Sequence, residues 1–174
     1  MDNIFVPNYQ FPADEVNQLG NYSDKPFDIH LMMENPKDFI TKLNINNVKS
    51  ITIHLEINKD INELINLIKS YNYQVGLAIK PNTDINKLDQ YINIIDKVIV
   101  MSVEPGFGGQ TFMNNTVDRI NSIRSKRKDI IIEVDGGINN ETIKRIIDNT
   151  DIAVVGSYII NSKNYQEAIN NIKN

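Results

Sequence analysis

The sequence contains no cysteine and no tryptophan, and only two of its 174 residues are histidine. The lack of cysteine excludes a disulfide framework and thiol chemistry. No apolar run approaches the ~20 residues that cross a membrane, and the first residues, MDNIFVPNYQ, do not resemble a signal peptide. These absences predict a soluble protein of the cytoplasm with no membrane partner.

Clustered basic charge is also scarce. The formal net charge is −4, acidic and basic residues are interspersed, and the densest basic cluster is RSKRK at residues 124–128. We interpret that cluster as the end of a helix, where cations are favoured by the helix dipole. The composition therefore argues against a nucleic-acid partner. The length and the apolar fraction of 41% predict one domain, residues 1–174, with a substantial core.

Segments that favour strands alternate with segments that favour helices. The predicted strands cover residues 26–33, 50–56, 74–80, 97–103, 130–137 and 152–159. The predicted helices lie near 36–44, 61–71, 84–95, 117–123, 139–148 and 164–173. This order is typical of parallel βαβ units, and hence of an α/β fold.

A glycine-rich loop directly follows the fourth predicted strand, with GFGG at residues 106–109. Glycine lets backbone amides approach an anion such as phosphate, but a tight turn also needs glycine, and this loop alone does not separate the two. Further glycines follow the fifth strand, in DGG, and end the sixth, in GS. In (β/α)8 barrels and doubly wound sheets alike, ligands bind at the carboxyl ends of strands. Glycines at the last strand ends favour the barrel and one shared phosphate site.

Six segments then resemble the ribulose-phosphate 3-epimerase family, in its order and at its spacings along the whole chain. They are DIHLMMENP, ITIHLE, VGLAIKPNT, VMSVEPGFGGQTF, IEVDGGIN and VVGS. The resemblance implies a phosphate-binding TIM (β/α)8-type barrel. It also implies an isomerase of the pentose phosphate pathway that interconverts ribulose 5-phosphate and xylulose 5-phosphate by metal-assisted proton transfer at C3.

The resemblance assigns roles to particular residues. Asp135 is implied as a catalytic acid/base and metal ligand, and His30 as a second ligand of a divalent cation: zinc first, with iron, manganese or cobalt as alternatives. Met32 and Met101 are implied to pack against the substrate. The implied phosphate site comprises Gly106, Phe107, Gly108, Gly109, Gly136, Gly137, Gly156 and Ser157. His54 is left open between a supporting and a structural role.

The start of the chain, MDNIFVPN, resembles the segment that follows the family's second barrel strand. The predicted strands then correspond to strands three to eight, and the family's second-strand His and Asp would precede Met1. Strand alternation argues that Asp2 does not replace that Asp. We expect an incomplete barrel whose gap exposes apolar residues such as Leu31, Ile152 and Val154. Low stability, or association into a homo-oligomer through the open edges, should follow.

Each candidate also has a structural explanation: His30 as a structural histidine, Asp135 as a turn residue and the methionines as core. Three functional hypotheses stay open. The chain represents a family epimerase that begins upstream of Met1, or it is a catalytically weak sugar-phosphate-binding member. The third hypothesis is an epimerase for a related ketose phosphate such as allulose 6-phosphate. With Asp135 but no acid/base on the opposite face, the chain as given should epimerise poorly.

Overall fold

The computed structural model describes residues 1–173 and contains one six-stranded sheet, in which neighbours along the chain are neighbours in the sheet and all pairs are parallel. The strands are β1 (Phe27–Leu31), β2 (Val48–His54), β3 (Gln74–Ile79), β4 (Lys97–Met101), β5 (Ile131–Asp135) and β6 (Ile152–Val154). The prediction of successive parallel βαβ units is therefore confirmed.

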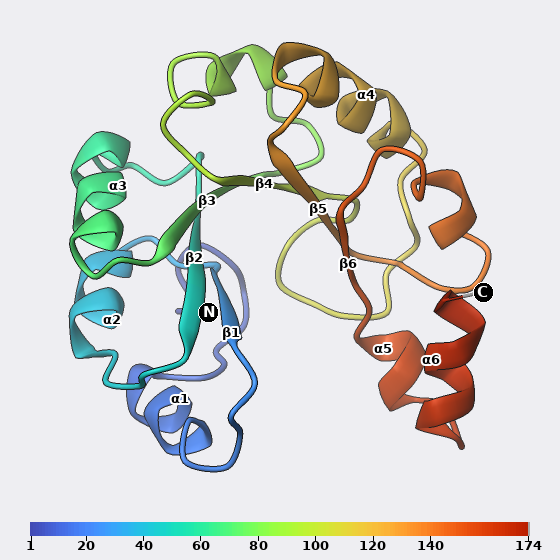
Figure 1. Cartoon of the computed structure of the whole chain (residues 1–174), viewed down its shortest axis with the longest axis horizontal. Coiled ribbons are helices and arrows are strands. Elements are labelled where there is room, and N and C mark those ends of the chain that lie inside the picture. The colour runs from blue at the N-terminus through green and yellow to red at the C-terminus, as the bar shows by residue number, and fades with distance from the viewer. Residues whose placement is uncertain (174) are drawn as a thin grey trace.

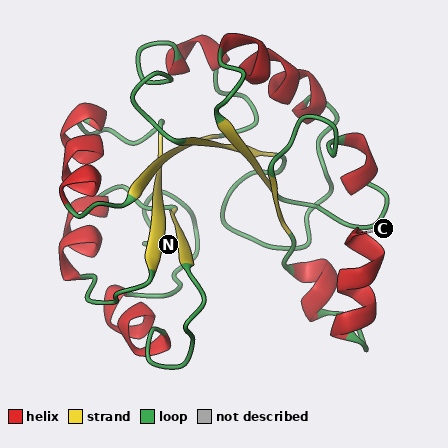
Figure 2. Ribbon diagram, in the orientation of Figure 1, coloured by secondary structure: helices red, strands yellow, loops and turns green. Residues whose placement is uncertain are grey.

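Helices lie along the convex side of this sheet, which curves into an arc with β1 and β6 at its two ends (Figure 1). They are α1 (Ala13–Leu19), α2 (Pro36–Lys42), α3 (Ile61–Ser70), α4 (Thr116–Lys126), α5 (Ser157–Ile160) and α6 (Tyr165–Lys173), with 3₁₀ turns η1 (Ile85–Leu88) and η2 (Ile143–Arg145). Within the described residues β1 and β6 do not pair, so the fold is an open part of a barrel, as predicted (Figure 2).

The helix α3 shows how the sequence produces these elements. Ile61, Leu64, Ile65 and Ile68 are buried, at the spacing that places side chains on one helical face. The Asp60 side chain accepts hydrogen bonds from the backbone N–H groups of Asn62 and Glu63, which caps the helix start. None of the helices within residues 1–173 is long and apolar enough to cross a membrane.

Two predicted helices are much shorter than expected. Residues 84–95 form the 3₁₀ turn η1 followed by turns, and residues 139–148 contain only the 3₁₀ turn η2. Both segments are rich in Asn, Asp and Ile, which favour helices weakly, and tertiary burial of Leu88, Ile92 and Ile143 holds them instead. The helix α1 was not predicted.

The last predicted strand, 152–159, was also too long. β6 ends at Val154, and Ser157 is the first residue of α5 instead of a strand residue. Val154 is 37% exposed at the open edge, as expected, and Ile152 is half-buried. The expectation for Leu31 was wrong: it is 3% exposed, because it belongs to the cluster that packs between the sheet and its outer helices.

The concave side of the sheet holds a second, smaller apolar cluster. It consists of Val6, Met32, Ala78, Ile99, Met101 and Val103, with Met1 and Phe5 packed against it. Strand alternation explains the separation, since Ile99 and Met101 face the interior while Val98 and Val100 belong to the large cluster on the helix side. The interior at the carboxyl ends of the strands is thus partly filled by methionines and by the N-terminal segment.

An ionic cluster fills the interior at the amino ends of the strands. Lys97 Nζ lies 2.6 Å from both carboxylate oxygens of Asp28 and 2.7 Å from Glu133 Oε2. The Lys97 side chain is 3% exposed and that of Glu133 is 5% exposed. Burial raises the pKa of Glu133. Burial opposes ionisation of Asp28 too, but its bonds to Lys97 and Ser50 outweigh this and lower its pKa.

Candidate functional site

A cavity of about 460 Å³ opens at the carboxyl ends of β4, β5 and β6. Of the residues implicated by sequence, eleven line it: Met32, Met101, Gly106, Phe107, Gly108, Gly109, Asp135, Gly136, Gly137, Gly156 and Ser157. Met1, Gln10 and Phe11 contribute the wall from the N-terminal segment. The remaining candidate, His30, lies beside Asp135 and lines an adjoining cavity of about 240 Å³.

The glycine loop after β4 is held in shape by side chains. Gln110 Nε2 donates to the carbonyl oxygens of Glu104 at 2.6 Å and Phe107 at 2.9 Å. Asn8 Nδ2 donates to the Gly106 carbonyl at 2.7 Å and so joins the N-terminal segment to the loop. Gly106 and Gly109 have φ angles of 126° and 76°, which other residues adopt only with strain. The loop therefore has a defined shape where Gly106 and Gly109 line the cavity.

The glycines after β5 and β6 approach this loop closely. Gly137 has φ 62°, and a Cβ placed on it would lie 2.7 Å from the Phe112 amide nitrogen. A Cβ on Gly108 would lie 2.7 Å from Ser157 Oγ. The three glycine-bearing loops therefore converge on one wall of the cavity, and side chains at 108 and 137 would keep them apart. This arrangement suits an anion that is bound by several backbone amides.

Asp135 is the last residue of β5 and projects into the interior. Its backbone carbonyl accepts hydrogen bonds from both the amide and the hydroxyl of Ser102 at 2.9 Å. Its carboxylate Oδ2 lies 3.4 Å from His30 Nδ1, and the two side chains are 22% and 15% exposed. Asp135 and Glu104 are the two carboxylates among the described residues that line the cavity. Asp135 is therefore positioned to exchange a proton with a molecule in the cavity.

His30 is also linked to a buried pair that the sequence did not assign to the site. His30 Nε2 lies 3.0 Å from His54 Nε2, and His54 Nδ1 lies 3.0 Å from Glu56 Oε2. Burial lowers the pKa of His54 to about 4, so this imidazole is neutral near pH 7. Burial alone would raise the pKa of Glu56, but hydrogen bonds from His54, Thr83 and the Lys80 amide outweigh it and lower the pKa.

The described residues hold no group of three or more side chains arranged to bind a metal. His30 Nδ1 and Asp135 Oδ2 are close enough to share one cation, with its other positions left to water or to ligand oxygens. Asp2 does not supply a further ligand. Its carboxylate instead accepts hydrogen bonds from the backbone amides of Ile4, Phe5 and Glu34. This agrees with the prediction that the Asp2 side chain points away from the site.

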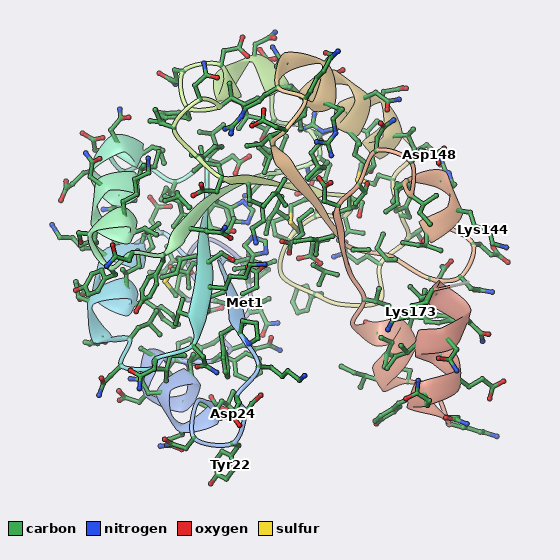
Figure 3. All side chains as sticks on the ribbon, in the orientation of Figure 1. Met1, Tyr22, Asp24, Lys144, Asp148 and Lys173 are labelled. Atoms are coloured by element: carbon green, nitrogen blue, oxygen red, sulfur yellow. The ribbon has the colours of Figure 1, made fainter. Side chains whose placement is uncertain are left out.

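The methionines form the apolar part of the cavity. Met101 is 1% exposed and Met32 is 8% exposed, so both are buried beneath the cavity that they line. Met1 lies on the inner side of the arc, near β1 (Figure 3). Phe107, in contrast, is 57% exposed at the rim. The cavity therefore combines an apolar floor, a glycine wall and one carboxylate beside a histidine.

Comparisons with known proteins agree with these features. The profile of the Ribulose-phosphate 3 epimerase family matches residues 1–160. A ribulose-phosphate 3-epimerase of Buchnera aphidicola subsp. Baizongia pistaciae is 37% identical, in an alignment covering 99% of this chain and 79% of the relative. One from Aquifex aeolicus is 32% identical, covering 99% of this chain and 80% of the relative.

A solved structure supports the fold. Phosphoribosyl anthranilate isomerase from Thermococcus kodakaraensis superposes with a TM-score of 0.66 at 14% identity, covering 97% of this chain and 84% of that one. At this identity the likeness concerns the barrel fold alone. The family assignment depends on the profile and on the relatives above 30% identity, and both extend over most of the chain. The protein therefore belongs to the ribulose-phosphate 3-epimerase family.

Proposed function

We propose that the protein binds ribulose 5-phosphate or xylulose 5-phosphate in the 460 Å³ cavity and moves the proton at C3 through Asp135. The observation that carries this proposal is the position of Asp135, whose carboxylate lines the same cavity as the three glycine-bearing loops. A pentulose phosphate has both features that such a cavity accommodates: an anionic end for the glycine wall and a carbon acid next to a ketone for the carboxylate.

The phosphate group would lie against Gly108, Gly109, Gly137, Gly156 and Ser157. Backbone amides in glycine loops bind anions well because no side chain blocks the close approach of the backbone to the anion. None of the described residues that line the cavity is a lysine or an arginine, so backbone N–H groups and the Ser157 hydroxyl would supply the polar contacts. The apolar floor of Met32 and Met101 would leave room for the sugar carbons.

The proton transfer needs a base within reach of C3. Asp135 fits this role because its strand end is anchored by Ser102 and its carboxylate opens into the cavity. His30 Nδ1 and Asp135 Oδ2 would hold a divalent cation. Such a cation, when bound, would stabilise the negative charge that develops on the ketone oxygen. The donor pair of one imidazole and one carboxylate is compatible with zinc, manganese or iron and does not select among them.

A second candidate function follows from the number of carboxylates. Inversion at C3 needs an acid/base on each face of the carbon. Of the described residues that line the cavity, only Asp135 and Glu104 have carboxylates, and Glu104 lies exposed in the glycine loop. The protein would then bind the sugar phosphate and exchange the C3 proton on one face, with inversion slower by about 10²- to 10⁴-fold. Inversion of a related ketose phosphate in this cavity would be slowed for the same reason, because an acid/base on the second face is needed for that substrate as well.

Exchange with deuterated water separates these functions. Each pentulose 5-phosphate is incubated with the protein and Mn²⁺ in D₂O while NMR follows deuterium at C3 and formation of the other epimer. Epimerisation places deuterium in both sugars together with interconversion. One-face exchange labels one sugar only, well before its epimer forms.

Two variants complete this experiment. Asp135→Asn should abolish exchange, because the amide cannot accept the proton, while Glu104→Gln should preserve it. Exchange that survives in Asp135→Asn contradicts the proposed role of Asp135. If neither sugar exchanges in the unmodified protein, the proposal of C3 chemistry at this site is wrong.

A further inference from the structure

Four side chains form a continuous line from the cavity into the protein interior: Asp135, His30, His54 and Glu56. The successive atom pairs are Asp135 Oδ2 to His30 Nδ1 at 3.4 Å, His30 Nε2 to His54 Nε2 at 3.0 Å, and His54 Nδ1 to Glu56 Oε2 at 3.0 Å. These residues come from the carboxyl ends of β5, β1 and β2. Each imidazole uses both of its nitrogens, so the protons along the line depend on one another.

At the inner end of the line, the hydrogen-bond partners of Glu56 determine which nitrogen of His54 carries the proton. Glu56 Oε1 accepts the Lys80 backbone N–H at 2.7 Å and also the Thr83 hydroxyl. The other oxygen, Oε2, faces His54 Nδ1. An ionised carboxylate only accepts hydrogen bonds, so His54 Nδ1 must carry the proton. The His54 side chain is 0% exposed, and such burial disfavours a charged imidazole, so with the proton on Nδ1 its Nε2 carries a lone pair.

The proton positions on the outer histidine, His30, follow from those on His54. The lone pair on His54 Nε2 can only accept, and therefore His30 Nε2 donates its proton across the 3.0 Å contact. In a neutral imidazole His30 Nδ1 is then a lone pair as well. The 3.4 Å distance from His30 Nδ1 to Asp135 Oδ2 exceeds the usual 2.7–3.2 Å of an N–H···O bond. Two acceptors that face each other in this way attract a cation.

We infer that Glu56 and His54 are positioning residues that fix His30 as its Nε2–H tautomer, so that the Nδ1 lone pair points toward Asp135 and the cavity. The opposite tautomer would donate from Nδ1 to Asp135 and would block both lone pairs. That a cation then occupies the position between them rests on the proposed function. The tautomers of His30 and His54 in the metal-free protein do not depend on that function.

The packing around the line also restrains both rings. The rings of His30 and His54 lie at 24° to each other with centroids 5.0 Å apart, and the Phe5 ring centroid lies 4.6 Å from that of His54. Lys80 Nζ lies 4.0 Å from the centre of the Phe5 ring. With the rings restrained in this way, the tautomer is set by the hydrogen-bond partners and not by rotation of the imidazoles.

The variant Glu56→Gln tests which atoms donate and which accept hydrogen bonds along this line. The Lys80 amide is a fixed donor, so the oxygen of the introduced amide side chain should remain there and its NH₂ group should face His54 Nδ1. Both imidazoles would then adopt the opposite tautomer, and His30 would donate from Nδ1 to Asp135. Glu34→Gln is the matched control, because Glu34 also accepts a backbone N–H, from Asn58, while none of the hydrogen bonds among the described residues joins it to either histidine.

Nitrogen-15 NMR of the imidazole rings in the metal-free protein is the measurement. The chain has two histidines, so a His30→Gln variant assigns the signals. Unmodified protein and Glu34→Gln should show His30 Nδ1 as a pyridine-type nitrogen, and Glu56→Gln should convert it to a pyrrole-type nitrogen. A pyrrole-type His30 Nδ1 in the unmodified protein overturns the inference, even if Glu56→Gln does not fold. Unchanged tautomers in a folded Glu56→Gln variant overturn it too.

Metal titration gives the second measurement. Calorimetry with Mn²⁺ and Zn²⁺ should give about 10- to 100-fold weaker binding to Glu56→Gln than to the unmodified protein or Glu34→Gln. Equal affinities in a variant whose tautomers have reversed contradict the positioning role. If the unmodified protein shows the assigned tautomers but binds neither cation, the metal in the proposed function is wrong while the tautomer assignment stands.

Discussion

Replacing Lys97 by methionine should destabilise the protein strongly. Lys97 Nζ is the cation between two carboxylates, 2.6 Å from Asp28 and 2.7 Å from Glu133. The Glu133 side chain is 5% exposed, so Lys97→Met leaves a buried charge without its partner. Loss of one partner of a buried ion pair typically costs about 3–5 kcal/mol. This is a large share of the ~5–15 kcal/mol that stabilises a typical domain.

Urea unfolding followed by circular dichroism at pH 7 measures this loss, and a second variant isolates its cause. In Lys97→Met/Glu133→Leu the buried charge is gone, so much of the stability should return, while Asp28, 36% exposed, remains hydrated. Burial already raises the folded-state pKa of Glu133. Without Lys97 it should rise further, so the destabilisation of the single variant should shrink as the pH is lowered from 7 and Glu133 takes up a proton. A free energy of unfolding within about 1 kcal/mol of the unmodified protein at pH 7 would refute the reasoning.

Three further outcomes are expected. Gly137→Ala should lower the free energy of unfolding by at least about 1–2 kcal/mol, since its φ is 62° and its Cβ would meet Phe112. Gly156→Ala should change the urea midpoint little, because among the described residues its Cβ would have only its own chain neighbours within 4 Å. Titration with millimolar inorganic phosphate should shift the amide NMR signals of Gly108, Gly109, Gly137, Gly156 and Ser157, and unchanged glycine signals would exclude the phosphate site. Hydrogen bonds from backbone amides lower the pKa of Asp2 despite its partial burial. Its stabilisation is therefore present above the unfolded pKa of about 3.9 and lost as pH falls through the folded value, so Asp2→Ala should cost about 1 kcal/mol at pH 7 and progressively less below pH ~3.9 in urea unfolding. A constant difference across that range would contradict this account.

The sequence was sufficient to predict the strands because each is a run of mainly apolar residues, and three of them carry a polar residue at the carboxyl end: His30 of β1, His54 of β2 and Asp135 of β5. Parallel βαβ order then brings those ends together at one edge. The 3₁₀ turns at 85–88 and 143–145 could not be predicted, because the buried side chains suit a helix and only the weak helix propensity of Asn, Asp and Ile opposes it.

The roles of His54 and Glu56 were missed for a different reason. Their spacing, H-x-E at the end of β2, is visible in the sequence, but nothing in one strand shows that Glu56 accepts the Lys80 amide or that His54 lies 3.0 Å from His30. Those contacts depend on the register of neighbouring strands. The candidate site residues were found individually, while the connections among them required the three-dimensional arrangement.

The order of strands in the sheet has a consequence for folding. Every strand pairs with the next one along the chain, so the arc can grow from one neighbour to the next at low loop-closure cost. The contacts across the concave side are different: Asn8 to Gly106 spans 98 positions and Lys97 to Asp28 spans 69. The cavity should therefore form late, after the strands that surround it. In native-state hydrogen exchange the amides of β3 and β4 should open last, and those of the three-residue β6 first.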